Sequence, residues 1–229
     1  MLLAGLEKLS LIDYPEQISA ILFTQGCNFR CPFCHNPELI PLENKYPFSE
    51  KDLFLFLDKR HGLLDGVTIT GGEPLLQHNL VSLIEKIKAK DFLVKLDTNG
   101  TNPVLLKKLI KTGLVDYWAM DIKGPLEKYA FITKVPVDLK AIQKSIQLIQ
   151  TSGQIYEFRT TVLPALHDLA DIEKIGQLLQ GAQRFYLQNF RNFKTLDPTF
   201  SQESSFTHAE LEQMQKILEK YIEKVGIRS

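Results

Sequence analysis

The sequence lacks an apolar stretch long enough to cross a membrane. A spanning helix needs about eighteen uncharged apolar residues in a row, and no run approaching that length occurs among the 229 residues. The opening residues MLLAGLEKLSLIDYPE also lack the form of a secretory signal, because Glu7, Lys8 and Asp13 interrupt them and no basic region precedes them. We therefore expect a cytoplasmic protein that does not bind membranes.

An excess of charge of either sign is also absent. The chain has 27 basic and 27 acidic residues, which give a formal net charge of +0. Non-specific binding to nucleic acid or to an anionic membrane surface draws on a basic excess, so neither is an expected partner. The length and the hydrophobic content of 44% are ordinary for a globular protein, and we expect one domain over residues 1–229.

Cysteine is scarce, and all three cysteines lie within eight positions. They are Cys27, Cys31 and Cys34, in the stretch FTQGCNFRCPFCHNPEL over residues 23–39. In a reducing compartment, an odd and tightly grouped set of thiols indicates metal binding or catalysis rather than a disulfide framework.

Three interpretations of the cysteine group are open from the spacing. The thiols could be incidental, or they could form a structural zinc site with His35, His167 or His208 as the fourth ligand. The third interpretation, which we favour, is a [4Fe–4S] cluster on the three thiolates. Three protein ligands leave one iron open to a small molecule, which is the arrangement of a catalytic metal site.

Strand-like apolar runs alternate with stretches of helical period along the chain. Near-continuous apolar strands of this kind predict a parallel sheet covered by helices. Six β-α units are too few for a closed eight-stranded barrel, so we expect an incomplete (β/α)6 TIM-like barrel of class α/β. The six predicted strands are residues 18–24, 66–70, 92–98, 116–123, 155–163 and 184–190.

The remaining segments are assigned around this barrel. Residues 1–17 are expected as an N-terminal extension and residues 25–48 as the cluster-binding loop. Residues 206–229 are expected as a C-terminal helix, which begins at a capping box of Thr207 and Glu210 and carries an apolar face that extends to Val225. The polar connection over residues 190–205 is predicted to be a loop near the site or a lid.

Polar residues gather where the predicted strands end. In parallel α/β folds the chemistry lies at the carboxyl ends of the strands, and here those ends carry TQGC, TGGEP, DTNG, MDIK, RTTVLP and LQNF. Gly71 and Gly72 allow a close backbone approach to a ligand, although TGGEP alone also fits a tight β-α turn. Asp121, Lys123 and Arg159 either bind a ligand or form ion pairs.

The motif CxxxCxxC after the first strand, followed by GGEP after the second, resembles the signature of the radical S-adenosylmethionine (SAM) enzymes, which are oxidoreductases. This resemblance implies that SAM occupies the open iron, that its reductive cleavage yields a 5′-deoxyadenosyl radical, and that Phe33 lies against the adenine. It also implies that Gly71, Gly72 and Glu73 bind the amino group of SAM. His35 and Asn36 either shape the loop or touch the ligand.

Later motifs resemble one branch, the activases of glycyl radical enzymes. By that resemblance Asp97, Thr98 and Asp121 form a monovalent-cation site, and Lys123 and Arg159 lie beside SAM. The segment LQNF departs from the branch, so no role is carried over to Gln188 or Asn189.

The N-terminal residues most resemble activating proteins of anaerobic ribonucleoside-triphosphate reductases. The implied partners are such a reductase and a flavodoxin or ferredoxin as electron donor. Alternatives are another glycyl radical enzyme of the pyruvate formate-lyase type, a small-molecule substrate, or a zinc-stabilised α/β binding module without enzymatic activity.

Overall fold

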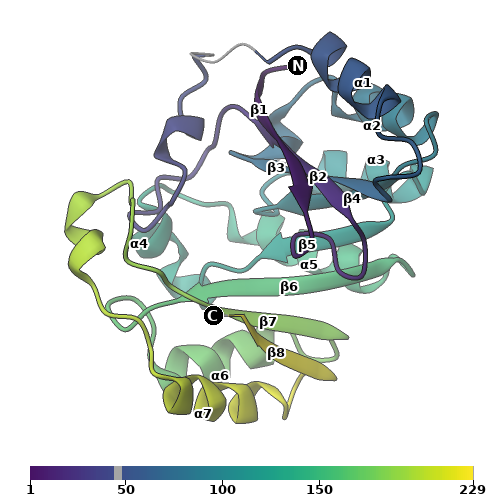
Figure 1. Ribbon diagram of the computed structural model, residues 1–229. Coiled ribbons are helices and arrows are strands. Elements are labelled where there is room, and N and C mark those ends of the chain that lie inside the picture. Colours follow the sequence, from purple (N-terminus) through teal and green to yellow (C-terminus); the bar gives the residue numbers. More distant parts are fainter. Residues whose placement is uncertain (44–47, 229) are drawn as a thin grey trace.

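The structure is a computed structural model that describes residues 1–43 and 48–228. Residues 44–47, which belong to the expected cluster-binding loop, and residue 229 lie outside the described residues. Eight strands form one sheet in the order of the chain, from β1 to β8 (Figure 1). The strands are β1 Leu3–Ser10, β2 Ser19–Thr24, β3 Gly66–Gly71, β4 Leu93–Thr98, β5 Tyr117–Asp121, β6 Ile155–Val162, β7 Arg184–Asn189 and β8 Lys224–Arg228.

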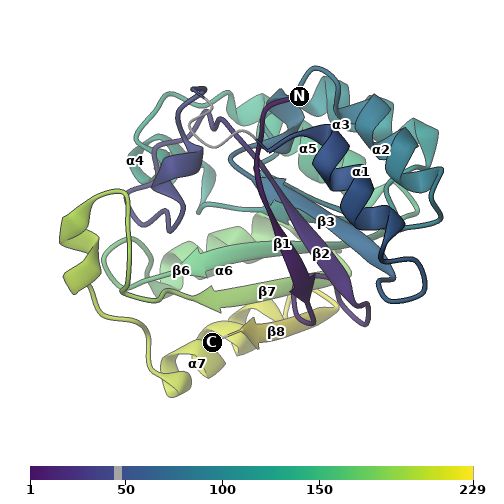
Figure 2. The ribbon, with the colours of Figure 1, turned by 45° about the horizontal axis from the view of Figure 1, so that its top comes forward.

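The expected α/β class and partial barrel are confirmed. Strands β2 to β8 pair in parallel, and helices connect them along the outer face of the curved sheet (Figures 1 and 2). The six predicted strands correspond to β2–β7. The helices are α1 Glu50–Asp58, α2 Leu80–Lys88, α3 Pro103–Thr112, α4 Tyr129–Thr133, α5 Leu139–Gln150, α6 Leu169–Leu178 and α7 His208–Leu218, with short 3-10 turns at Pro37–Leu39, Pro74–Leu76, Leu126–Lys128 and Pro198–Gln202.

Both ends of the described chain add strands that the sequence did not predict. The expected extension over residues 1–17 contributes β1, which pairs antiparallel with β2. The expected helix over residues 206–229 starts at the predicted capping box but ends at Leu218, and the chain then returns as β8 beside β7. Val225 is buried in the observed strand and would also be buried on the apolar face of a longer helix. The apolar pattern therefore does not show that the helix ends at Leu218.

The helix expected directly from Pro74 is also different. Residues Pro74–Leu76 form one 3-10 turn, and α2 begins only at Leu80, because Gln77 adopts an extended backbone conformation.

Side chains alternate between two environments across the sheet. One set, such as Val94, Trp118 and Phe158, packs against the helices in the main apolar core. Most of the alternate residues of the same strands are polar and point to the inner face, where Tyr117 and Glu157 are hydrogen-bonded to each other. The inside of the partial barrel is therefore lined by charged and hydroxyl groups.

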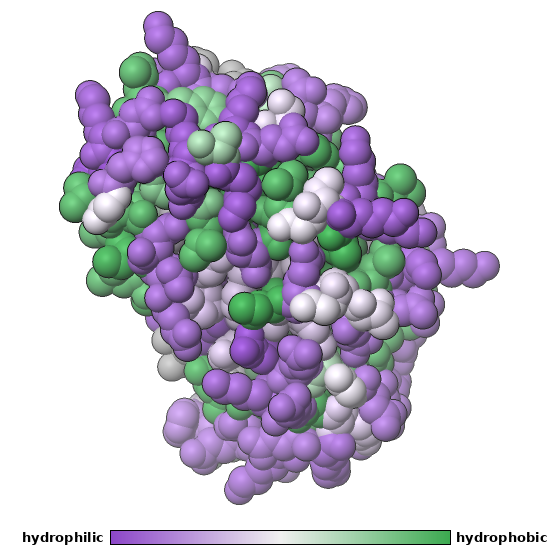
Figure 3. Space-filling view, turned by 90° about the vertical axis from the view of Figure 1, so that its right-hand side faces the viewer, coloured by the Kyte–Doolittle hydropathy of each residue, from purple (hydrophilic) through white to green (hydrophobic). Residues whose placement is uncertain are grey.

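The polar interior opens at the carboxyl ends of the strands. The amino ends of the strands lie at the opposite end of the partial barrel. Tyr14, from the connection between β1 and β2, is buried there and packs edge-on against Tyr117, with ring centroids 5.8 Å apart. The side of the molecule on the right of Figure 1 is mostly hydrophilic, with apolar residues in separate small patches (Figure 3). Among the described residues, no helix is both long and apolar enough to cross a bilayer.

Candidate active site

A cavity of about 240 Å³ opens at the carboxyl ends of β2 to β6. Eleven of the twelve site residues predicted from the sequence line it, and Arg159 is the exception. The eleven are Cys27, Cys31, Phe33, Cys34, Gly71, Gly72, Glu73, Asp97, Thr98, Asp121 and Lys123. Residues without a predicted role that also line it include Phe29, Ile40, Thr70, Asn99 and Thr161.

The three cysteines share one wall of this cavity and lie in apolar surroundings. Cys31 is buried, and a second apolar cluster around it includes Phe29, Phe33 and Phe190. Burial raises the pKa of all three thiols, that of Cys31 to about 12. Metal ligation requires the thiolate, so metal binding at this wall releases protons.

The arrangement fits an iron–sulfur cluster better than a single metal ion. Within residues 1–43 and 48–228, no three His, Cys, Asp or Glu side chains converge closely enough to hold one ion, whereas zinc needs all its sulfur ligands at about 2.3 Å. A [4Fe–4S] cluster binds each thiolate through a different iron, so three thiols spread over one apolar wall suit it.

The histidines considered as a fourth zinc ligand have other partners. Nε2 of His35 lies 2.9 Å from the carbonyl of Arg191, and Nε2 of His167 lies 2.9 Å from the carbonyl of Lys123. His208 is exposed on α7, 3.4 Å from Glu212. His35 lines the cavity together with the cysteines, whereas His167 and His208 are not among its lining residues.

Gly71 and Gly72 bring the end of β3 against the start of the cysteine loop. Gly71 has φ +118, and a Cβ on Gly72 would lie 2.0 Å from the carbonyl oxygen of Gly26. The amide of Glu73 donates to that same oxygen at 2.8 Å. Only glycine permits this approach, so the two predicted residues also fix the cysteine loop to the sheet.

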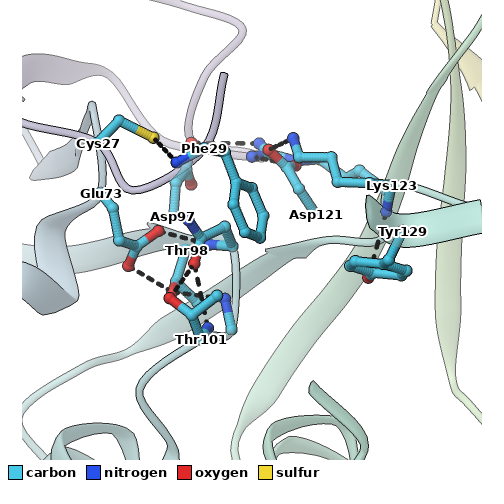
Figure 4. A network of polar contacts seen from close by, with 12 residues as sticks. Cys27, Phe29, Glu73, Asp97, Thr98, Thr101, Asp121, Lys123 and Tyr129 are labelled. Carbon is cyan, nitrogen blue, oxygen red and sulfur yellow. Dashed lines mark hydrogen bonds and ion pairs between the residues drawn. The ribbon is translucent and has the colours of Figure 1, made fainter. Parts of the chain in front are cut away.

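Glu73 is buried, and its carboxylate ties the end of β3 to the end of β4. Its carboxylate accepts a hydrogen bond from the hydroxyl of Thr98 at 2.7 Å (Figure 4). It also accepts from the amides of Leu75 at 3.0 Å and Asn99 at 2.6 Å. Burial raises its pKa to about 7, although these bonds oppose the shift. A carboxylate has about four acceptor sites, so one remains for a ligand in the cavity.

Acidic and basic side chains alternate on the opposite wall. The guanidinium of Arg159 bridges Asp121, at 2.9 Å, and Asp97, at 3.2 Å. Lys123 lies 3.1 Å from Asp121 (Figure 4). Lys95 also pairs with Asp97. Burial opposes ionisation of Asp121, but Arg159 and Lys123 keep its pKa below the ordinary value. Arg159 therefore stands behind the two cavity carboxylates instead of lining the cavity.

A polar clamp that the sequence analysis missed joins the cysteine loop to the end of β4. Asn99 Nδ2 donates to the side-chain oxygen of Asn28 at 2.8 Å, and Asn28 Nδ2 donates to the hydroxyl of Thr101 at 2.9 Å. The only signal in the sequence was that these residues neighbour the motifs.

The connection over residues 190–205 packs on the cysteine loop. His35 stacks on Phe193, with ring centroids 4.2 Å apart, Lys194 lies 2.6 Å from Glu38, and the amide of Asp197 donates to the carbonyl of Pro32 at 2.9 Å. No residue of this segment lines the cavity. Asn189 anchors its far end through two hydrogen bonds with the backbone of Phe206.

Comparison with known proteins identifies the family of the chain. The model of the radical SAM superfamily matches residues 21–179. A protein of Methanocaldococcus jannaschii, provisionally described as a glycyl-radical enzyme activating enzyme, is 37% identical over 233 residues, which cover 100% of this chain and 96% of the relative. The pyruvate formate-lyase-activating enzyme of Clostridium pasteurianum is 24% identical and covers 96% of this chain and 94% of its own length.

Solved structures share the fold. A domain of the pyruvate-formate lyase-activating enzyme from Bacteroides vulgatus matches with a TM-score of 0.56 and 17% identity, over 72% of this chain and 99% of that one. Streptococcus suis SuiB bound to its precursor peptide SuiA matches with a TM-score of 0.70 and 13% identity, over 90% of this chain and 47% of that one. The chain belongs to the radical SAM superfamily and, within it, to the branch of glycyl-radical enzyme activating enzymes.

Proposed function

We propose that this enzyme cleaves SAM reductively at a [4Fe–4S] cluster and installs a glycyl radical on an anaerobic ribonucleoside-triphosphate reductase. The observation that carries the proposal is the cavity in which three thiols face the Gly71–Glu73 turn and the carboxylates of Asp97 and Asp121. When bound, the cluster supplies the electron that breaks the C5′–S bond of SAM, and the resulting 5′-deoxyadenosyl radical takes a hydrogen atom from the substrate glycine.

The residues of the chain would hold the two groups as follows. Cys27, Cys31 and Cys34 supply the thiolates. The free acceptor site of Glu73, together with the backbone of Gly71 and Gly72, suits the ammonium group of SAM. Phe33, which is buried on the cysteine wall, offers an apolar ring for the adenine.

Lys123 offers a positive charge near the carboxylate of SAM. Lys123 lines the same cavity as Cys27 and Cys31. There its positive charge would suit the carboxylate of SAM. Apolar side chains pack around the cysteine wall.

The monovalent cation implied by the resemblance stays a prediction. Asp97 and Asp121 lie on one wall, as the prediction requires, but Lys95, Arg159 and Lys123 already bring three positive charges to them. A bound cation would share these carboxylates with the basic side chains. SAM affinity measured with and without potassium tests it.

The choice of partner is supported by the N-terminal residues, which resemble those of reductase-activating proteins and which form β1 and the connection to β2. The whole-chain similarity to the Clostridium pasteurianum enzyme favours pyruvate formate-lyase as the second candidate partner. An electron donor of the flavodoxin or ferredoxin class completes the proposed system.

The decisive experiment mixes the reconstituted, reduced enzyme and SAM with each candidate partner and records the electron paramagnetic resonance spectrum. We expect a glycyl radical signal with the reductase and 5′-deoxyadenosine as the second product. Cys31→Ala should give neither. A radical on pyruvate formate-lyase alone would move the assignment to that partner, and 5′-deoxyadenosine with no radical on either partner would contradict activation of both.

A further inference from the structure

A second group of charged residues lies deeper in the partial barrel, beneath the carboxylates of the cavity. Its centre is Glu157 on β6, which is fully buried. The guanidinium of Arg228 on β8 donates to both carboxylate oxygens of Glu157 at 2.7 Å, and the hydroxyl of Tyr117 donates to Oε2 at 2.7 Å. None of these three residues lines the cavity.

The position of Arg228 is fixed by the register of β8. Gly226 pairs with Tyr186 on β7, and a Cβ on Gly226 would lie 2.7 Å from the Tyr186 ring. The absent side chain leaves that ring free to lie against β8. The guanidinium of Arg228 stacks on it, 3.6 Å from the ring centroid, which is a favourable contact for an arginine.

Arg159 lies between this group and the cavity. Its Nη1 is 3.2 Å from Asp97 Oδ2, within hydrogen-bonding distance, and 3.9 Å from Glu157 Oε1. Glu157 Oε1 is the same atom that accepts from Arg228 Nη1. Arg159 and Arg228 are thus two cations within reach of one buried carboxylate oxygen, and Arg228 holds the shorter contact.

Whether Arg159 pairs with Asp97 and Asp121 or with Glu157 changes the charges that face the cavity. When Arg228 satisfies Glu157, Arg159 directs its donors to Asp97 and Asp121, both of which line the cavity. Without Arg228, a fully buried carboxylate would lose its bidentate partner, which is costly. A movement of Arg159 by less than 1 Å would bring Nη1 within hydrogen-bonding distance of Glu157, at the expense of Asp97.

We propose that Arg228 is a positioning residue for SAM binding, because it saturates Glu157 and so leaves Arg159 to orient Asp97 and Asp121. The inference rests on the proposed function of the cavity as the SAM site. It assigns β8, which lies outside the matched residues 21–179 of the superfamily model, a part in the active site.

Equilibrium dialysis of SAM against the anaerobically reconstituted protein tests the proposal, with iron content measured on the same samples. We expect Arg228→Gln to weaken SAM affinity about tenfold while iron content stays unchanged. The double variant Arg228→Gln with Glu157→Gln removes the charge that attracts Arg159, and should return the affinity to within about threefold of wild type. Lys224→Gln, on the exposed start of β8, is the matched control and should bind as wild type does.

The outcomes distinguish a failure of the role of Arg228 from a failure of the proposed SAM site. If Arg228→Gln does not fold, Arg228→Lys carries the test: it keeps the charge but loses the bidentate bond, so an affinity between those of wild type and tenfold weaker is expected. Wild-type affinity in these variants, or a double variant as weak as Arg228→Gln, would overturn the role of Arg228. A wild-type protein that holds the cluster but binds no SAM would overturn the proposed function and this inference with it.

Discussion

Several residues of this site hold neighbouring segments together and also line the cavity. Glu73 caps a 3-10 turn, ties β3 to β4 and still faces the cavity. Lys123 pairs with Asp121 while its backbone contacts Tyr129 and His167. Substitution of such residues therefore changes the free energy of unfolding together with ligand binding, and the two effects have to be measured separately.

Glu73 gives a prediction about pH. Its pKa is raised from 4.5 to about 7 by burial, so the folded protein binds a proton more tightly than the unfolded chain does. The stability that this proton contributes is present below pH 4.5 and is lost as the pH rises to 7. It amounts to about 3 kcal/mol.

Glu73→Gln should remove this part of the pH dependence. Denaturant unfolding of wild type and variant between pH 4.5 and 8 should show a difference in free energy of unfolding that changes steadily up to pH 7 and then levels off. Glu85→Gln, on the exposed face of α2, is the control and should follow wild type. Parallel pH profiles of Glu73→Gln and wild type would contradict a titrating Glu73.

Among the larger elements, the cysteine loop is held from three sides. The turn after β3 contacts it through Gly72, the end of β4 through Asn28, and the segment over residues 190–205 through His35 and Pro32. That segment contacts the back of the loop and contributes no residue to the cavity. From this position the segment can support the wall of the cavity that carries the cysteines.

Loss of the His35 side chain should loosen the cluster. His35→Ala removes the ring stacked on Phe193 and the contact with the carbonyl of Arg191, worth about 1 kcal/mol. We expect iron to be lost to a chelator about fivefold faster than from wild type. The control is His61→Ala in the turn between α1 and β3, where the ring packs on Phe92. Equal rates in His35→Ala and wild type would show that the contact does not support the loop.

The molecule has two apolar clusters, and only the smaller one contains a cysteine. The main core lies between the sheet and its helices and contains no cysteine. The smaller cluster surrounds the cysteine wall. We therefore expect the barrel to fold without a bound metal, in contrast to small zinc domains, which unfold without it.

Removal of iron should leave the molecule folded. After chelation we expect an unchanged far-ultraviolet circular dichroism spectrum and a cooperative thermal transition, while a protease should cleave the cysteine loop faster. Collapse of the spectrum on chelation would instead indicate a metal-dependent fold and would revive the zinc-stabilised module.

The sequence by itself determined the order of β2 to β7 and the grouping of the three thiols, because apolar periodicity and the spacing of three cysteines are local properties. Tertiary structure decided that Arg159 stands behind Asp97 and Asp121, that Asn28 meets Asn99, and that Arg228 reaches Glu157. Asn28 and Asn99 are 71 positions apart in the chain, as are Glu157 and Arg228. Whether such residues touch depends on the curvature and register of the sheet, and no short stretch of sequence contains either.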